Sequence, residues 1–351
     1  MALILIFYPK IHVLTKWLKF DKIKGLKIHH QKGMSARKFW LSKEVMLGMS
    51  FTVLVAVPFI VFGGSKQVYV DKDAKGSEEG TQNHPYRSIS KALKNAKEGT
   101  DVHIAKGTYK ENITIPKGVK LFGKKKDMGD VVIKADNEDK PTVSMKHQTE
   151  LNFLTVQGGR HGVRVLEDAK VKIYKVKVKK SNRDGIHIDA APRDKKHRAL
   201  IDTVEVRESA RAGIYSEKRD IVVINSDIMS NKSDGVDLAA GMEAWFEGNR
   251  INQNGGSGIK VILDNASVWT KSNSIRNNKR EGVEVNSYGG AGNVGLKKAQ
   301  LVGNGRYGVA RVARTVSGQN RFGGIILGTG VNDNRLEANH IGSTSPVLRG
   351  F

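Results

Sequence analysis

The chain has 351 residues, 39% of them apolar, and a formal net charge of +24 at pH 7. This length suits one large domain or two ordinary ones, each with a buried core. There is no cysteine, which excludes disulfide frameworks, thiolate metal sites and cysteine nucleophiles. The positive charge favours a polyanionic partner, such as nucleic acid, anionic lipid or acidic polysaccharide.

The first element along the chain is an apolar segment at residues 45–65, which is uncharged and about long enough to cross a bilayer. Residues 1–44 are basic, with Asp21 and Glu44 as their only acids, so the positive-inside rule predicts a cytoplasmic N-terminus. We expect a single-pass membrane protein with an extracytoplasmic domain, and no nucleic-acid partner. The alternatives are a secreted protein cleaved after this segment, and a start at Met34 instead of Met1.

The next element is a short helix. Ile89, Ala92, Leu93 and Ala96 follow the helical period, so we expect a helix over residues 88–96. In a repeat protein such a helix covers the open end of the core. We predict that residues 66–345 form one domain and that residues 346–351 are a tail.

Beyond residue 150 a pattern of glycine, aliphatic, polar and aliphatic residues recurs. It begins at Gly162 (HGVRV) and returns every 22 to 28 residues as far as Gly308, with a weaker copy at Gly324. A period of this length, built of short strands and Gly/Asn turns, is typical of a β-solenoid. Alternation within the strands predicts six inward side chains: Val163, Ile186, Ile214, Val236, Ile259 and Val283.

A second repeated position lies four residues before each glycine. In a coil with turns about 4.8 Å apart, side chains at such a position can hydrogen-bond to their copies above and below. Asparagine also tolerates the left-handed turn conformation. We therefore expect a ladder made by Ser181, Ser209, Asn231, Asn254, Asn278, Asn304 and Asn320.

A series of short motifs precedes the repeats: Gly80-Thr81, Pro85-Tyr86, Ser88-Ile89, Ala92-Leu93, Gly99-Thr100, and Gly107-Thr108-Tyr109 with Glu111. Together with the repeats, they resemble the pectate-lyase-like superfamily, which includes pectinesterases, polygalacturonases and uronate epimerases. The resemblance implies an all-β, right-handed parallel β-helix. The same scaffold also carries non-catalytic binding and adhesive proteins. No catalytic motif set of these families is present intact.

Stacked strands turn repeated positions into columns on the surface. We call two neighbouring columns, taken together, the polar strip. The outward residues two after each glycine are Arg164, His187, Tyr215, Asp237, Lys260, Glu284 and Ala310. The residues just before each glycine are His161, Asp184, Ala212, Asp234, Ser257, Glu281 and Tyr307.

Four residues of the polar strip are the predicted catalytic set for uronate chemistry. Such chemistry needs a cation for the carboxylate, a base for the adjacent proton and an acid for the leaving oxygen. Arg164 can pair with the carboxylate, and His187 is the expected base near neutral pH. Tyr215 can donate or accept a proton, and Asp237 completes the set. The resemblance implies similar residue types in metal-independent members of the superfamily.

We expect Asp184 and Lys260 to bind substrate, together with a basic insertion beside the polar strip that forms one wall of a groove. The insertion contributes Arg193, Lys195, Lys196, His197 and Arg198.

Two alternatives to the catalytic hypothesis involve the same strip. One is a Ca²⁺ site formed by four aspartates: Asp184, Asp189, Asp234 and Asp237. This alternative is less favoured because the turn at Gly213 supplies no acid, so we predict no metal site. Alternating charges on the strip could instead form a plain ion-pair ladder, made by Asp237, Lys260 and Glu284. The sequence therefore predicts a protein that acts on or binds acidic polysaccharide or another cell-surface glycan, as a uronan lyase or epimerase. The alternative is a non-catalytic carbohydrate-binding or adhesive surface protein.

Overall fold

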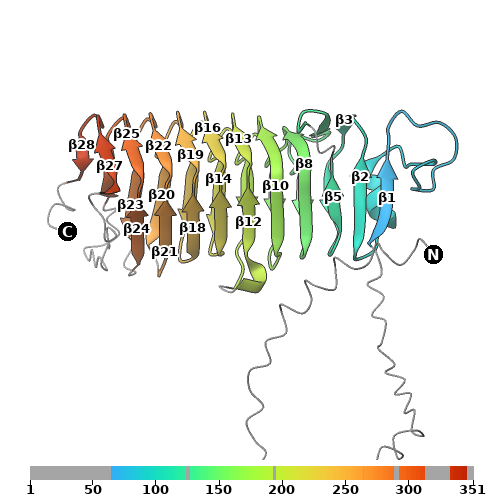
Figure 1. Cartoon of the computed structure of the whole chain (residues 1–351), viewed down its shortest axis with the longest axis horizontal. Coiled ribbons are helices and arrows are strands. Elements are labelled where there is room, and N and C mark those ends of the chain that lie inside the picture. The colour runs from blue at the N-terminus through green and yellow to red at the C-terminus, as the bar shows by residue number, and fades with distance from the viewer. Residues whose placement is uncertain are drawn as a thin grey trace, which may run out of the picture. The chain divides into compact units, whose positions relative to one another are not determined.

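The computed structural model describes residues 65–123, 127–192, 195–263, 265–287, 292–312 and 333–345, which form a right-handed parallel β-solenoid (Figure 1). The predicted membrane segment at residues 45–65 lies outside this described part except for Ser65, and so does the predicted tail at residues 346–351. Within the described residues, no helix is long and apolar enough to span a membrane.

One side of the coil is a ten-stranded sheet built from the glycine repeat. The strands of the repeats from Gly162 to Gly282 bury the aliphatic residues and place the residue between them on the outer face, as strand alternation requires. The strands in stacking order are β4 (Ile113–Ile115), β7 (Val143–Met145), β9 (Val163–Val165), β11 (Ile186–Ile188), β14 (Ile214–Glu217), β17 (Val236–Ala239), β20 (Ile259–Leu263), β23 (Val283–Ser287), β26 (Tyr307–Val312) and β28 (Gly342–Thr344).

The rest of the coil is an 18-stranded sheet made of two columns, which β8 (Thr149–Gln157) and β10 (Val171–Lys179) join because each runs through both. The first column also contains β1 (Lys66–Val70), β2 (Thr100–Ile104), β5 (Lys120–Phe122), β12 (Ala199–Asp202), β15 (Ile221–Ile224), β18 (Glu243–Glu247), β21 (Ser267–Lys271) and β24 (Asn293–Lys297). The second column also contains β3 (Gly107–Lys110), β6 (Val131–Lys134), β13 (Glu205–Arg207), β16 (Asp227–Met229), β19 (Arg250–Asn252), β22 (Ser274–Arg276), β25 (Gln300–Val302) and β27 (Arg335–Glu337).

The repeat pattern correctly predicted the core and the register of the ten-stranded sheet. The six side chains expected to point inward are all 0% exposed. Arg164 pairs with His187, His187 with Tyr215, and Tyr215 with Asp237, so the outward column is continuous. It continues through Lys260 to Glu284.

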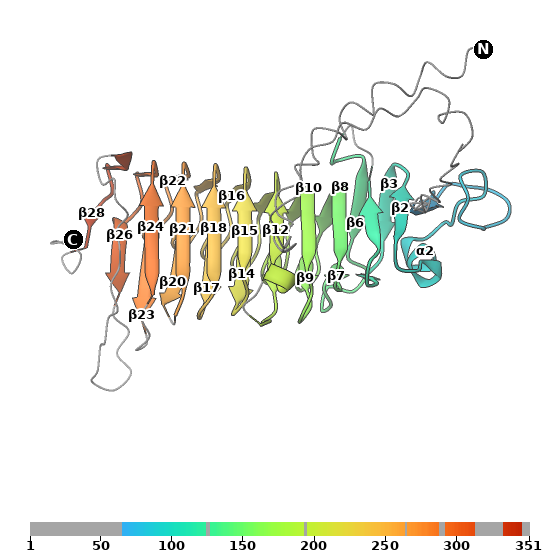
Figure 2. The same ribbon diagram turned by 60° about the horizontal axis from the view of Figure 1, so that its bottom comes forward.

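The predicted helix is confirmed as α2 (Ile89–Asn95) at the N-terminal end of the solenoid (Figure 2). Ser88 is its N-cap, and its side chain accepts a hydrogen bond from the Lys91 amide, which satisfies a backbone donor of the first turn. Ile89, Ala92 and Leu93 are buried and join the core, so the helix packs its apolar side against β1, β2 and β4.

The asparagine ladder is present, but its conformation differs from the prediction. The Nδ2 atom of Asn231 donates to Asn254 Oδ1 at 3.0 Å, and Asn254 donates in the same way to Asn278 at 3.0 Å. The left-handed residue is the one before each ladder position, such as Ser230 (φ 55°) and Gln253 (φ 55°). This kink turns the chain, and the ladder side chain then points into the coil.

The C-terminal end of the ladder corrects the sequence alignment. Asn304 donates to Asn339 Oδ1 at 2.9 Å, and β26 pairs with β28. The turn that stacks on the Gly308 repeat therefore comes from residues 334–345. The Gly324 repeat and Asn320, which we had expected there, lie outside the described residues.

A second ladder, missed in the sequence, lies between the two columns. Asn249 Nδ2 donates to Asn273 Oδ1 at 2.9 Å, and Ser226 N donates to Asn249 Oδ1 at 2.9 Å. Two ladders therefore fasten successive turns to one another at both ends of β16, β19 and β22.

Candidate functional site

The polar strip brings three predicted catalytic side chains together on adjacent turns. Arg164, His187 and Tyr215 come from β9, β11 and β14, which are paired in register. The His187 and Tyr215 rings are stacked, with centroids 4.8 Å apart and planes 13° apart. The His161 ring lies 4.2 Å from His187 on the other side. Three rings are therefore clustered in the N-terminal part of the strip, with His187 and Tyr215 stacked and His161 tilted by 40° against His187.

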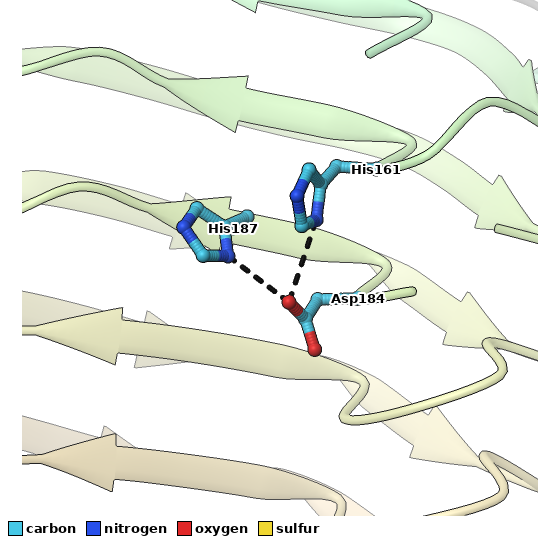
Figure 3. A group of neighbouring side chains, drawn as sticks. All are labelled: His161, Asp184 and His187. Atoms are coloured by element: carbon cyan, nitrogen blue, oxygen red, sulfur yellow. Dashed lines mark hydrogen bonds and ion pairs between the residues drawn. The ribbon is translucent and has the colours of Figure 1, made fainter. Parts of the chain in front are cut away.

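His187 is held between two carboxylates. Its Nδ1 lies 3.0 Å from Asp184 Oδ2, and its Nε2 lies 3.3 Å from Asp189 Oδ1. His161 Nδ1 approaches the same Asp184 oxygen at 3.4 Å, and Figure 3 shows both imidazoles directed at it. The other Asp184 oxygen accepts from the backbone amide of Ala212 at 3.3 Å. Asp184 is buried and fully engaged by protein groups, so it positions His187 and does not offer a free carboxylate to substrate.

The pKa values of the two histidines in this cluster are shifted in opposite directions. Burial tends to lower the pKa of His187, but its hydrogen bonds to Asp184 and Asp189 outweigh burial and raise that pKa. Burial lowers the pKa of His161, and its contact with Asp184 compensates only in part. Burial opposes ionisation of Asp184, but hydrogen bonds from both imidazoles hold its pKa below the usual range. His187 therefore carries a proton more readily than the base expected from the sequence.

Arg164 and Tyr215 are also constrained. Arg164 Nε donates to both Asp189 oxygens, at 3.1 and 3.0 Å, yet 43% of its side chain stays exposed. Burial raises the pKa of Tyr215, and Glu217, Asp237 and Asp184 raise it further. Tyr215 is consequently a proton donor at neutral pH.

The C-terminal half of the strip is a partial ion-pair ladder. Lys260 Nζ lies 3.1 Å from both oxygens of Asp237, as the ladder alternative predicted. Glu284, however, is 0% exposed, and Ser257 Oγ donates to it at 2.6 Å. Its cationic partner is Arg280 at 3.3 Å. Charge alternation therefore explains one pair of the three residues.

Among the described residues, one group of side chains could bring three metal-ligand atoms together: His161, Asp184 and His187, whose atoms lie within 4.8 Å of one another. Both nitrogens of His187 face carboxylate oxygens, so this arrangement suits a protonated imidazole better than a metal ligand. The four aspartates of the Ca²⁺ alternative do not form one cluster. Asp184 and Asp189 bind His187, whereas Asp234 and Asp237 face Lys260.

The basic insertion does not stay beside the polar strip. It leads from β11 in the ten-stranded sheet to β12 in the first column, so its last residue, Arg198, lies at a hollow on the first column. The ring of His197 lies 6.1 Å from His147, which precedes β8 of that column. Lys195 and Lys196 belong to a short 3-10 helix (Lys195–His197), and Arg193 lies outside the described residues. The expectation that Arg198 lies next to His187 was therefore wrong.

Sequence reasoning missed two exposed tryptophans on the first column, Trp245 and Trp269. They occupy paired positions on β18 and β21. A signal was available, because they are 24 residues apart, within the range of the glycine repeat.

The chain is similar in sequence pattern and in fold to known proteins. A family model described as "right handed beta helix region" matches residues 161–341. No curated protein sequence matches the chain. Three similar solved structures are 12 to 15% identical to the chain, and identities in this range show a shared fold alone.

Structures of two different proteins match with TM-scores of at least 0.50. Pectate lyase Pel9A matches with a TM-score of 0.50 and 15% identity, over 70% of this chain and 68% of that one. The enzymatically active domain of tailspike protein 2 of bacteriophage CBA120 matches with a TM-score of 0.52 and 12% identity, over 70% of this chain and 41% of that one. The periplasmic alginate epimerase AlgG has a TM-score of 0.43 and 15% identity, over 71% of this chain and 61% of that one. The chain thus spans less than two thirds of the epimerase and of the tailspike domain.

Proposed function

Because the chain belongs to the right-handed β-helix family, we propose that it acts on acidic polysaccharide at the polar strip, as a uronan lyase or C5-epimerase. The similarity in fold to a pectate lyase is consistent with this substrate class. The observation that carries the proposal is the His187 imidazole, which is fixed between Asp184 and Asp189 and stacked on Tyr215. Two proton-carrying groups are thereby placed side by side on a surface that also presents Arg164.

The strip residues can divide the chemistry among themselves. Arg164 pairs with the uronate carboxylate, which makes the neighbouring C5 proton more acidic. In elimination, Asp237 takes the C5 proton, the C4–O4 bond breaks, a C4=C5 double bond forms, and His187 gives its proton to O4. In epimerisation the C4–O4 bond stays, protonated His187 stabilises the negative charge that develops on the carboxylate, and Tyr215 returns a proton to C5 from the opposite face. Each proton transfer contributes to the rate by general acid–base catalysis.

The test is removal of the C5 proton itself. The full chain is incubated in D₂O with pectate, alginate and glycosaminoglycans, and product is followed by unsaturated-uronate absorbance and by deuterium at C5. We expect one substrate to give either signal, and His187→Gln to abolish it. His84→Gln is the matched control, because His84 lies in an exposed loop away from the strip. The absence of both signals with every substrate would contradict the proposal.

A second candidate is binding without catalysis. It is favoured by one observation, which is that Arg164, His187 and Asp237 already pair with protein charges. Retained binding of a polysaccharide with neither unsaturated-uronate absorbance nor deuterium at C5 would select this candidate.

For the localisation, we propose that residues 45–65 anchor the protein in the membrane and that the solenoid lies on the extracytoplasmic side. The support is the uncharged apolar run and the basic residues before it. Carbonate extraction of membranes tests the anchor, because an anchored chain stays in the pellet, whereas a secreted protein cleaved after this segment appears in the soluble fraction.

A further inference from the structure

Two tryptophans lie on adjacent turns of the first column. Trp245 on β18 and Trp269 on β21 are register partners, and they are 39% and 43% exposed. Figure 2 shows these strands side by side with β15 and β24. A pair of open indoles forms a contiguous apolar patch, which marks a binding surface more often than a single exposed residue does.

The indoles are fixed before any ligand arrives. Trp245 Nε1 donates to Glu247 Oε2 at 3.1 Å, and Trp269 Nε1 donates to Ser267 Oγ at 3.2 Å. On the next turn, Gly295 pairs with Trp269, and a Cβ at Gly295 would come within 2.1 Å of the indole. The absence of a side chain there lets Trp269 lie against the backbone. A preformed aromatic surface spends little conformational entropy on binding.

Three neighbouring hollows that share lining residues run along the first column, and together we call them the tryptophan groove. The two tryptophans lie between two of these hollows. Both indoles line a hollow of about 340 Å³ and a smaller one of about 100 Å³. Arg198 and Val222 line the first of these and also a third hollow of about 660 Å³. The residues that line the groove come from eight strands of the first column: β5, β8, β10, β12, β15, β18, β21 and β24.

The groove is basic. Its acidic lining residues are Glu150 and Glu243, whereas its basic residues are Lys120, Lys170, Lys172, Arg198, Lys271 and Lys297. Arg198 is only loosely paired, since the nearest carboxylate oxygens, of Glu243 and Asp220, are 3.9 and 4.0 Å away. Its Nε is buried without a hydrogen-bond partner. The side chain as a whole is 31% exposed and lines the groove, so an anion can approach it there.

We propose that the tryptophan groove binds a chain of acidic polysaccharide along the solenoid axis. The sugar rings place their C–H faces against Trp245 and Trp269, whose ring faces are electron-rich. The carboxylates pair with Arg198 and the lysines. The ligand class rests on the proposed function, but this site is on another sheet than the polar strip. The groove therefore holds the polymer, whereas the strip carries out the reaction.

The binding test uses the full chain with Trp17→Phe and Trp40→Phe, so that Trp245 and Trp269 are the only indoles. Pectate and alginate are titrated while fluorescence is recorded, with dextran as the neutral polysaccharide and polyglutamate as the polyanion without sugar. We expect saturable quenching by one acidic polysaccharide and none by dextran. By isothermal titration calorimetry, Trp245→Ala with Trp269→Ala weakens that binding by about tenfold or more, as for aromatic anchors elsewhere. Phenylalanine at both positions restores most of it.

Two results would overturn the inference. One is equal affinity of the wild type and the double alanine variant for both acidic polysaccharides. The other is an equal loss of polyglutamate affinity in that variant, because this would mean that charge alone is recognised. Failure here is distinguishable from failure of the proposed function, since His187→Gln tests the reaction and leaves the groove intact.

Discussion

The polar strip and the tryptophan groove lie on two different sheets of the same coil, and they differ in what they leave open to a ligand. In the strip every key charge has a close protein partner, such as His187 with Asp184 at 3.0 Å. In the groove Arg198 stays about 4 Å from its carboxylates, and two indoles remain open. Paired charges fix protons at defined atoms, whereas loosely paired cations and open rings leave contacts for a ligand. The solenoid can hold both kinds of surface because the two sheets take their outward side chains from different positions of each turn.

The largest expected effect is on turnover, and it tests whether the reaction takes place at the polar strip. His187→Gln removes the group that holds the donated proton, so we expect turnover to fall by about 10²- to 10⁴-fold. Affinity for polymer in the groove should not change, and calorimetry checks this. A variant that keeps full turnover would show that His187 is only structural.

The next largest effect is on stability, at the corner between the two sheets. Arg219 is fully buried and donates to the carbonyls of Leu166, Ala169 and Ala190 at 2.9 to 3.4 Å. Burial lowers its pKa to about 10. Arg219→Met keeps the packing but leaves these carbonyls without a donor. We expect the free energy of unfolding to fall by about 3 kcal/mol.

Chemical denaturation measures that change, and Arg250→Met is the control. Arg250 pairs with Asp227 on the exposed surface, so its loss should cost less than about 1 kcal/mol. Equal losses in the two variants would contradict the role given to Arg219.

The smallest effect is the pH dependence of stability. His187 has a raised pKa, so its contribution is fully present below its ordinary value of 6.5 and is lost as pH rises through the folded-state pKa. The difference in unfolding free energy between wild type and His187→Gln should therefore be largest in mildly acidic solution and shrink above neutral pH. A difference that grows with pH would mean that His187 is buried in its neutral form. Denaturant titrations at several pH values measure it.

The sequence predicted most of the scaffold because repetition adds information at every turn. One glycine pattern specified the buried residues and the outward register, since any slip by one residue would expose the whole aliphatic set. The second ladder could have been found, since Ser226, Asn249 and Asn273 each lie nine residues before a repeat glycine, but the same position holds Val204 and Ala299 on the flanking turns. The alignment at Gly324 was wrong because a long segment separates β26 from β28, and a period alone cannot detect an insertion.

The candidate site was predicted less well, for physical reasons. The column placed Arg164, His187 and Tyr215 together, as the register requires. It could not reveal that Asp184 and Asp189 hold both nitrogens of His187, because these residues lie just before and just after β11, where strand alternation does not set the side-chain direction. Arg198, the last residue of the basic insertion, was assigned to the wrong face, since a connection between sheets places its two ends on different sides of the coil.

The most direct measurement of the central claim compares two variants on two substrates. The full chain, His187→Gln, and Trp245→Ala with Trp269→Ala are each given polymeric and short uronate substrates, and product and binding are recorded together. We predict that the histidine variant binds polymer without forming product, and that the tryptophan variant processes short oligosaccharides but binds polymer about tenfold more weakly. Loss of both binding and turnover in each folded variant, or of neither in both, would contradict two separate sites.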